Sequence, residues 1–497
     1  MPPTSHQSPN RYVNDLRRLG AQRGEVRSFF AKLFPFFVAM IFLVIVGVYG
    51  SLSLQVANEN LIMLVAAAII GGYMALNIGA NDVANNMGPA VGGRVLTVMA
   101  AVLIAAVCES AGAILAGGDV VKTVAKGIIQ PGDGLTVADF RNLMLSALFA
   151  AALWVNLATY LNAPVSTTHS IVGGVMGAGI GAAGFGLVNW VTMLKIAASW
   201  VISPVFGGIV AAIILLFIQV QVFNQSDRKK AANRWVPVLI GLMAGAFAAY
   251  MALKGLKKIW KPSTIEIIIY SCAAFFVCWL ISIPYISRLS SSITNQKRDI
   301  NSLFHLPLII GVALLSFAHG ANDVANAIGP LAAIVSTFSH TTVEAKVAIP
   351  MWVLLIGAAG LALGLLLFGP KLINTVGEKI TRLNAPRSYC VALASAVTVL
   401  IATTMGLPVS STHIAIGAIF GVGFLRELLE NPDKRRLKPG HKLNHTAKEA
   451  FNNVNARLGR KLVRRRFVIS IAAAWVITVP AAAILSAFLF FVLQSLI

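Results

Sequence analysis

The sequence predicts an all-α polytopic membrane protein of about twelve transmembrane segments, in which two tandem repeats have inverted topology. Composition is the first observation behind this class: 57% of the 497 residues are hydrophobic and 12% are charged, against about 25% charged residues in a typical soluble chain. Repetition is the second. Residues 79–91 (GANDVANNMGPAV) return as 320–332 (GANDVANAIGPLA), and 163–179 (APVSTTHSIVGGVMGAG) return as 407–423 (LPVSSTHIAIGAIFGVG). Two phrases repeated at nearly equal spacing indicate a tandem duplication.

Long uncharged runs divide the chain into segments, because a spanning helix needs about 20 mainly apolar residues. We expect broken or re-entrant helices where Gly, Pro and polar residues interrupt these runs. The runs and the repeats together predict seven segments: a cytoplasmic basic arm (1–33), a leading transmembrane helix (34–60), repeat 1 (61–220), a linker with two transmembrane helices (221–304), the first part of repeat 2 (305–424), a basic cytoplasmic insert (425–466) and the last transmembrane helix of repeat 2 (467–497).

The charge distribution predicts the orientation in an inner (plasma) membrane. The net charge is +22, and residues 425–466 alone carry 13 Lys and Arg against 4 Asp and Glu. Basic loops stay in the cytoplasm and contact anionic lipid, which explains the surplus without nucleic acid. With the amino terminus inside and each Ser/Thr segment counted as one crossing, the two GANDVAN segments lie seven crossings apart. An odd number inverts the repeats. In this count the lysine cluster at 254–261 falls on the outer side of the membrane, which disagrees with the orientation. Re-entrant Ser/Thr segments would change the parity of the crossing count.

The first repeated phrase places acids and amides inside the membrane. On a helix with a 100° step, the Asn, Asp and Asn of NDVAN share one face. A carboxylate at mid-membrane costs at least ~2.5–3.5 kcal/mol, so a matched pair indicates binding, with Asp–Asn locking of helices as the alternative. The pairs Gly88-Pro89 and Gly329-Pro330 are expected to break both helices. The candidate binding residues are Asn81, Asp82, Asn85, Asn322, Asp323 and Asn326.

The second repeated phrase has the pattern of a helix start. Proline followed by Ser and Thr is typical of a first turn, where a hydroxyl caps the helix and backbone amides stay free. A free helix amino terminus binds anions, and hydroxyls both donate to and accept from a partly protonated oxyanion. Ordinary capping is the alternative. The candidate binding residues are Ser166, Thr167, Thr168, Ser410, Ser411 and Thr412.

The two phrases together predict symport. Neither contains Lys or Arg, so an anion beside Asp82 and Asp323 would be repelled unless cations or a proton entered with it. Helix dipoles supply only about half a charge per end. We therefore expect an anion carried with a coupling ion, either H⁺ or Na⁺ bound at Asp82 and Asp323, and no resident cofactor. An anion channel would instead need a ring of Lys or Arg.

Three further titratable residues lie in apolar runs. Glu109 has no acidic counterpart in repeat 2, where Gly357 or a neighbour is expected, so it is a candidate for a one-sided cation or proton site. A paired or snorkelled glutamate is the alternative. His169 and His413 follow the Ser/Thr segments, and we expect hydrogen-bonded packing histidines, with a proton relay as the alternative. The GxxxG spacing after each histidine indicates close helix packing.

These residues resemble the PiT family of inorganic phosphate transporters, especially its bacterial low-affinity members. The resemblance covers roughly residues 60–495 and rests on the doubled GANDVAN and the paired PVSTTH and PVSSTH segments. It implies a homodimeric, inverted-repeat symporter that imports phosphate by alternating access, with the Asp, Ser and Thr residues above and the second Asn of each GANDVAN lining the site. Within the family, bacterial enteric-type members couple to H⁺ and carry neutral metal–phosphate complexes, while some other members use Na⁺. We expect H⁺, and a related sulfate-carrying subgroup leaves another tetrahedral oxyanion as the alternative substrate.

Two other classes are alternatives to a transporter. A membrane-embedded enzyme acting on a phosphorylated lipid would use His169 or His413, but the motifs lack the basic residues that clamp a phosphate. A phosphate-responsive receptor would signal through 425–466, which has no recognisable domain. We expect a transporter and not an enzyme.

Overall fold

The computed structural model describes residues 33–54, 58–130, 135–161, 165–255, 262–338, 349–377, 383–429 and 465–496. Within these ranges, 12 helices are long and apolar enough to span a membrane, which confirms the predicted all-α polytopic class. The basic arm and most of the 425–466 insert lie outside the described residues. The helices are a leading helix Leu33–Ser53, α2 (Asn58–Gly92), α3 (Val98–Ala116), α4 (Gly118–Lys122), α5 (Val137–Tyr160), α6 (Thr167–Ala183), α7 (Trp190–Ile218), α8 (Arg228–Tyr250), α9 (Thr264–Ser291), α10 (Lys297–Ile300), α11 (His305–Ser336), α12 (Met351–Gly377), α13 (Ala385–Thr404), α14 (Ser411–Leu429) and α16 (Arg465–Leu496).

Each repeat packs its helices against the other repeat. In repeat 1, α2 packs on α12 and α6 packs on α16; in repeat 2, α11 packs on α3 and α14 packs on α7. The predicted GxxxG contacts are confirmed at both places. A Cβ added at Gly177 would lie 2.2 Å from the Ala483 carbonyl oxygen, and one added at Gly421 would lie 1.9 Å from that of Gly208. Only glycine allows helices to approach this closely.

The two motif helices, α2 and α11, run in opposite directions where they cross. Gly71 of α2 packs against Leu331 of α11, whereas Asp82, further along α2, faces His319, which is earlier in α11. Along one common direction, the residue number therefore increases in α2 and decreases in α11. This is the direction that the predicted inverted repeats require.

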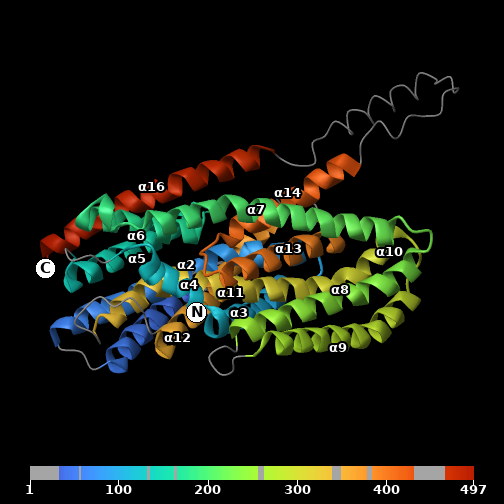
Figure 1. Cartoon of the computed structure of the whole chain (residues 1–497), viewed down its shortest axis with the longest axis horizontal. Coiled ribbons are helices and arrows are strands. Elements are labelled where there is room, and N and C mark those ends of the chain that lie inside the picture. The colour runs from blue at the N-terminus through green and yellow to red at the C-terminus, as the bar shows by residue number, and fades with distance from the viewer. Residues whose placement is uncertain are drawn as a thin grey trace, which may run out of the picture.

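Two antiparallel helix pairs place their tips at these motif helices. Thr159, at the end of α5, accepts a hydrogen bond from Asn81, and Thr167, at the start of α6, donates one to Asp82. The pair α13–α14 repeats this arrangement at Asn322 and Asp323. In Figure 1, α5 and α6 lie toward one end of the molecule, while α13 and α14 lie toward the end that holds α10.

The hairpins bear on the parity of the crossing count. An antiparallel pair of helices adds either two crossings or none, so counting both helices of a hairpin or neither leaves the parity unchanged. Without the hairpin α5–α6, the helices α3, α7, α8 and α9 lie between the two motif helices, and α11 is the fifth crossing after α2, an odd number. The parity changes only if the Ser/Thr helix is re-entrant and its partner helix crosses.

The expected breaks at the two Gly-Pro pairs are wrong. Helix α2 continues through Pro89 to Gly92, and α11 continues through Pro330 to Ser336. Proline has a helical φ and removes a single hydrogen bond, to the carbonyl four residues earlier. Both prolines are buried, and the helices packed around them hold the backbone in place.

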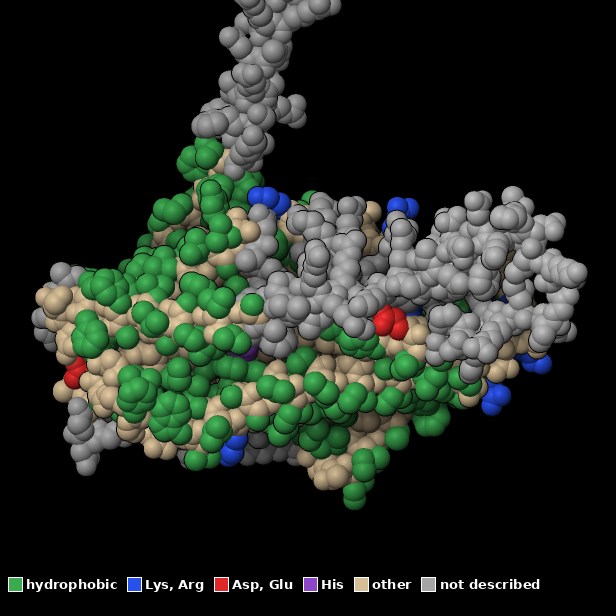
Figure 2. All heavy atoms as spheres, turned by 90° about the horizontal axis from the view of Figure 1, so that it is seen from above, with side chains coloured by type: hydrophobic (Ala, Val, Ile, Leu, Met, Phe, Trp, Pro, Cys, Tyr) green, Lys and Arg blue, Asp and Glu red, His purple; other side chains and the backbone are tan. Residues whose placement is uncertain are grey.

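The described surface has one ion pair at the lysine cluster and broad apolar areas. The Nζ atom of Lys254, one of the lysines that disagreed with the predicted orientation, lies 2.6 Å from Asp119 Oδ2 and is therefore partly neutralised. The lysines at 257, 258 and 261 lie outside the described residues. Figure 2 shows broad areas of apolar side chains with few charges on the face in view, as a lipid-facing surface requires.

Candidate functional site

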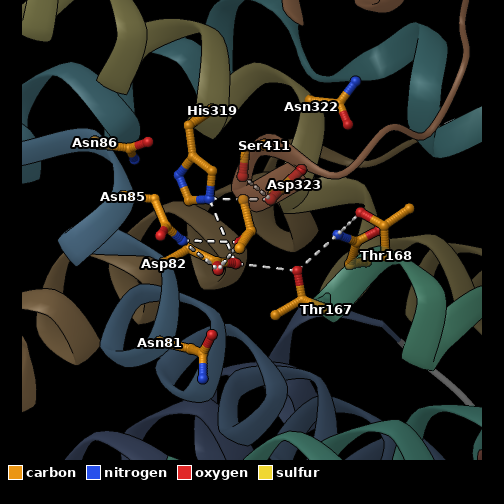
Figure 3. A network of polar contacts seen from close by, with 12 residues as sticks. Asn81, Asp82, Asn85, Asn86, Thr167, Thr168, His319, Asn322, Asp323 and Ser411 are labelled. Carbon is orange, nitrogen blue, oxygen red and sulfur yellow. Dashed lines mark hydrogen bonds and ion pairs between the residues drawn. The ribbon is translucent and has the colours of Figure 1, made fainter. Parts of the chain in front are cut away.

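The centre of the molecule holds both motif aspartates. Asp82 and Asp323 are each 1% exposed, and His319 between them is fully buried. The Nε2 atom of His319 lies 3.0 Å from Asp323 Oδ2 and 3.7 Å from Asp82 Oδ2. Figure 3 shows the imidazole directed toward both acids. The two acids that the sequence separates by 241 positions therefore form one site.

The predicted helix starts deliver hydroxyl groups to this site. The hydroxyl of Ser166 caps α6 by accepting a hydrogen bond from the His169 amide at 3.1 Å. The hydroxyl of Ser410 accepts one from the His413 amide at 3.3 Å, at the start of α14. These two serines cap the hairpin helices, and the hydroxyls of the next residues are directed to the acids.

Three hydroxyl groups hold the two carboxylates. Thr167 Oγ1 donates to Asp82 Oδ2 at 3.1 Å, and Thr412 Oγ1 lies 3.0 Å from Asp82 Oδ1. Ser411 Oγ donates to Asp323 Oδ2 at 3.2 Å. Asp82 thus binds hydroxyls from both repeats, while Asp323 binds one hydroxyl and the imidazole.

The second asparagine of each motif connects the repeats. Asn85 Nδ2 donates to Thr412 Oγ1 of the other repeat at 2.8 Å. Its counterpart, Asn326 Nδ2, lies 3.0 Å from Thr168 Oγ1 and 3.3 Å from Thr167 Oγ1. The matched pair of bonds makes a single site from residues of both repeats.

The first asparagine of each motif supports the hairpin tips. Asn81 Nδ2 donates to Thr159 Oγ1 at 2.8 Å, and Asn322 Nδ2 donates to Thr403 Oγ1 at 3.0 Å. Asn322 also accepts a bond from the Val409 amide at 3.2 Å. Figure 3 shows both side chains apart from the acid pair, so the structure places Asn81 and Asn322 as supports of the site.

A polar network that the motifs did not indicate lies beside the acids. Glu109 is fully buried, and its Oε1 lies 3.2 Å from His319 Nδ1 and 2.8 Å from the Asn86 amide that donates to it. Glu109 is therefore paired, not snorkelled. His319 and Asn86 were missed because neither is duplicated: Ile78 precedes the first GAND where His319 precedes the second.

The other two histidines pack behind the hydroxyls. The rings of His169 and His413 lie 4.6 Å apart, edge to face, and the His169 ring lies 3.8 Å from that of Trp200. Among the described residues, neither ring nitrogen of His169 has a hydrogen-bond partner. The expected packing role therefore fits His169, but without the hydrogen bond that was expected.

The oxygen atoms of the site suit a hard cation. Asp323 Oδ1 and Asn326 Oδ1 are buried, and neither accepts a hydrogen bond from the described part of the chain. Carboxylate and amide oxygens are the usual ligands of hard cations. Both nitrogens of His319 face carboxylates, so the oxygens of Asp82, Asp323 and Asn326 are the candidate ligands for a cation at this site.

Comparison with known proteins identifies the family of the chain. The family described as "Phosphate transporter family" matches residues 78–486. The chain belongs to the phosphate transporter family. It is 42% identical over 481 residues to a Helicobacter pylori protein named "Putative phosphate permease", covering 87% of this chain and 90% of the relative. A Haemophilus influenzae protein of the same name is 34% identical over 435 residues, covering 86% of this chain and 96% of the relative.

A solved structure is also similar. It is named "The sodium-dependent phosphate transporter", superposes with a TM-score of 0.78 at 36% sequence identity, and covers 88% of this chain and 100% of that one. Membership of a transporter family agrees with the expectation that the protein is not an enzyme.

Proposed function

We propose that the protein is a secondary active symporter that imports inorganic phosphate with H⁺ or Na⁺ by alternating access. One observation carries the proposal: hydroxyls and amides of both repeats meet two buried carboxylates at one point between oppositely directed helices. The family and the names of the relatives support phosphate as the substrate. A divalent metal carried with phosphate, and a homodimer in the inner membrane, belong to the same proposal.

The site's chemistry explains why an ion accompanies the substrate. The hydroxyls of Thr167, Thr168, Ser411 and Thr412 and the amino termini of α6 and α14 suit the oxygens of an oxyanion. Asp82 and Asp323 repel that anion unless a cation or a proton compensates. We favour H⁺ because of the buried network of Glu109 and His319; Na⁺ is the alternative, which the name of the solved relative supports.

The hairpins suit alternating access. One pair, α5–α6, approaches the site from the side opposite to α13–α14, and both tips contact the motif helices. Movement of one hairpin would open the site to one side while the other hairpin keeps it closed. A variant that loses the contacts of Asn81 would therefore affect the opening of the site to one side of the membrane. A variant that loses the contacts of Asn322 would affect its opening to the other side.

Uptake of ³²P-phosphate into proteoliposomes tests the substrate. We expect uptake that excess unlabelled sulfate leaves unchanged and that excess unlabelled phosphate abolishes. Competition by sulfate would assign the site to a different oxyanion. Failure to take up either anion under both H⁺ and Na⁺ gradients would refute the proposal.

A further inference from the structure

Helices α7 and α14 touch each other through small residues. The two helices pack together (Figure 1), and a Cβ added at Gly417 would collide with the carbonyl of Pro204, while one added at Gly421 would collide with that of Gly208. The two contacts lie four residues apart on both helices, so α7 and α14 run in the same direction here. Ala212, about one turn beyond Gly208, continues the row of small residues.

An apolar groove of about 540 Å³ follows this contact. Gly208, Gly417 and Gly421 leave it room because they have no side chain that could fill the space between the helices. Larger apolar side chains from both helices line it as well: Val201, Val205, Ile209, Phe420, Phe424 and Leu428. His413, at the end nearest the acid pair, is the one titratable residue of the lining. The lining therefore suits a hydrocarbon and not a polar ligand.

The groove opens toward the bilayer. The side chains of Val205 and Phe424, which line it, are 58% and 43% exposed, and Leu428 at its far end is 72% exposed. Both helices are long and apolar enough to lie in a membrane. Exposed apolar side chains on such helices contact lipid chains, which form no hydrogen bonds. The occupant is therefore expected to enter from the lipid side.

The dimensions of the groove fit a single lipid chain. Along α14 it extends from His413, next to the hydroxyls at the centre of the molecule, to Leu428. This stretch is about 22 Å long at about 1.5 Å per residue, enough to cross one leaflet, half of a hydrocarbon core about 30 Å thick. A volume of about 540 Å³ over this length gives a mean cross-section of about 25 Å², whereas a helix about 10 Å across needs about 80 Å². The groove is therefore too narrow for another helix.

Positive charge lies at the outer end of the groove. Arg426 is in the last turn of α14, and residues 425–466 carry 13 Lys and Arg against 4 Asp and Glu. Basic residues beside a membrane helix attract anionic lipid headgroups. By the spacing of the repeats, Arg426 corresponds to Ala182 and Phe424 corresponds to Ile180, so α6 of repeat 1 has neither the charge nor this aromatic side chain.

We propose that one acyl chain of an anionic phospholipid lies in the α7–α14 groove, with its headgroup at the Arg426 end. The bound chain contacts α7 and also α14, the helix that begins with the hydroxyls of the second hairpin. It therefore stabilises the contact between this hairpin helix and α7. The inference goes beyond the proposed transport and does not depend on it, because the site contains none of the residues assigned to phosphate.

Photolabelling tests the site in the full chain. The protein is reconstituted into liposomes that contain phosphatidylglycerol with a diazirine on its acyl chain, illuminated, and the labelled residues are mapped by mass spectrometry. We expect the label to concentrate on the groove residues of α7 and α14. Exposed residues of α9, such as Phe276 and Leu280, report ordinary contact with lipid.

Two labelling patterns would overturn the inference. Equal labelling per exposed residue in the groove and on α9 would mean that the groove has only ordinary lipid contact. Groove residues that stay unlabelled while α9 is labelled would mean that something else fills it, such as a second copy of the chain. No phosphate is present, so either result leaves the proposed function intact.

A variant that fills the groove has a matched control. Ala212→Phe places a ring in the groove, and Ala198→Phe makes the same change at an exposed position of α7 outside it. We expect groove labelling to fall to the level of α9 in Ala212→Phe and to stay unchanged in Ala198→Phe. Groove labelling that persists in Ala212→Phe would overturn the inference. If that variant does not fold, Val205→Trp fills the groove from an exposed position and is judged by the same result.

The headgroup is tested with a second lipid. Phosphatidylcholine with the same diazirine chain has no net charge, and we expect it to label the groove less than phosphatidylglycerol does. Equal labelling by the two lipids would overturn the anionic assignment. Arg426→Gln should reduce the preference for phosphatidylglycerol, and an unchanged preference would overturn the placement of the headgroup at Arg426.

Discussion

Neutralising Asp82 tests the role of the site's charge. Asp82→Asn keeps the shape of the side chain, and the hydroxyls of Thr167 and Thr412 can donate to its oxygen or accept from its amide, so the protein should fold. The bond from Asn85 is long, at 3.3 Å, and its loss costs about 1 kcal/mol. The main change is therefore the lost charge.

The size of that change follows from electrostatics. A cation about 4 Å from a carboxylate gains about 4 kcal/mol at an effective dielectric constant of about 20. Since about 1.4 kcal/mol is a tenfold change in affinity, Asp82→Asn should weaken binding of the coupling cation several hundredfold. Phosphate uptake at ordinary cation concentrations should then be nearly abolished.

The assay is ³²P-phosphate uptake at graded H⁺ and Na⁺ concentrations, with equal amounts of reconstituted protein. Asp119→Asn is the matched control: the same chemical change, at a partly exposed acid paired with Lys254, where an ion pair is worth about 0–1 kcal/mol. We expect the control to transport. Wild-type uptake and wild-type cation dependence in Asp82→Asn would refute the assignment of the cation to this carboxylate.

Three further outcomes are expected. Gly320→Ala should destabilise the protein by about 1–3 kcal/mol through overpacking, because the added Cβ would meet the Glu109 carbonyl. The control is Gly88→Ala, whose Cβ meets nothing within 4 Å, so this variant should keep or raise the melting temperature. Equal melting temperatures for the two variants would contradict the packing account. Ser166→Ala should cost about 1 kcal/mol by loss of the α6 cap, seen as a lower melting temperature. Thr412→Val should raise the KM for phosphate by about 10- to 150-fold, because a lost hydrogen bond to a charged group costs about 1.5–3 kcal/mol. An unchanged KM would place this hydroxyl outside the binding site.

Duplication made much of the site predictable. A single Asp or Thr in an apolar run carries little information, but Asp82 and Asp323 at matched positions pointed to one function. Helix capping predicted Ser166 and Ser410, because proline followed by hydroxyls has a local physical cause. The structure brings these residues together as the repeats implied.

Features without a counterpart were not predictable in this way. His319 and Asn86 occur once, and their role appears only when α2, α3 and α11 bring Glu109 beside them. The contacts of the hairpin tips depend on the residues at which α5 and α13 end. The hydropathy of the sequence does not show these helix ends, so the hairpins could not be predicted. The Gly-Pro pairs were misread because sequence shows the lost hydrogen bond but not the helices that hold Pro89 and Pro330 in place.

The most direct test of symport is accumulation against a gradient. Proteoliposomes containing the purified protein and a fixed internal phosphate concentration are placed in an equal external concentration, and an inward gradient of H⁺ or Na⁺ is imposed. We predict that internal ³²P-phosphate rises above the external level while one of these gradients lasts, and falls back when an ionophore collapses it. Equilibration without accumulation under either gradient would contradict coupled transport and indicate passive permeation.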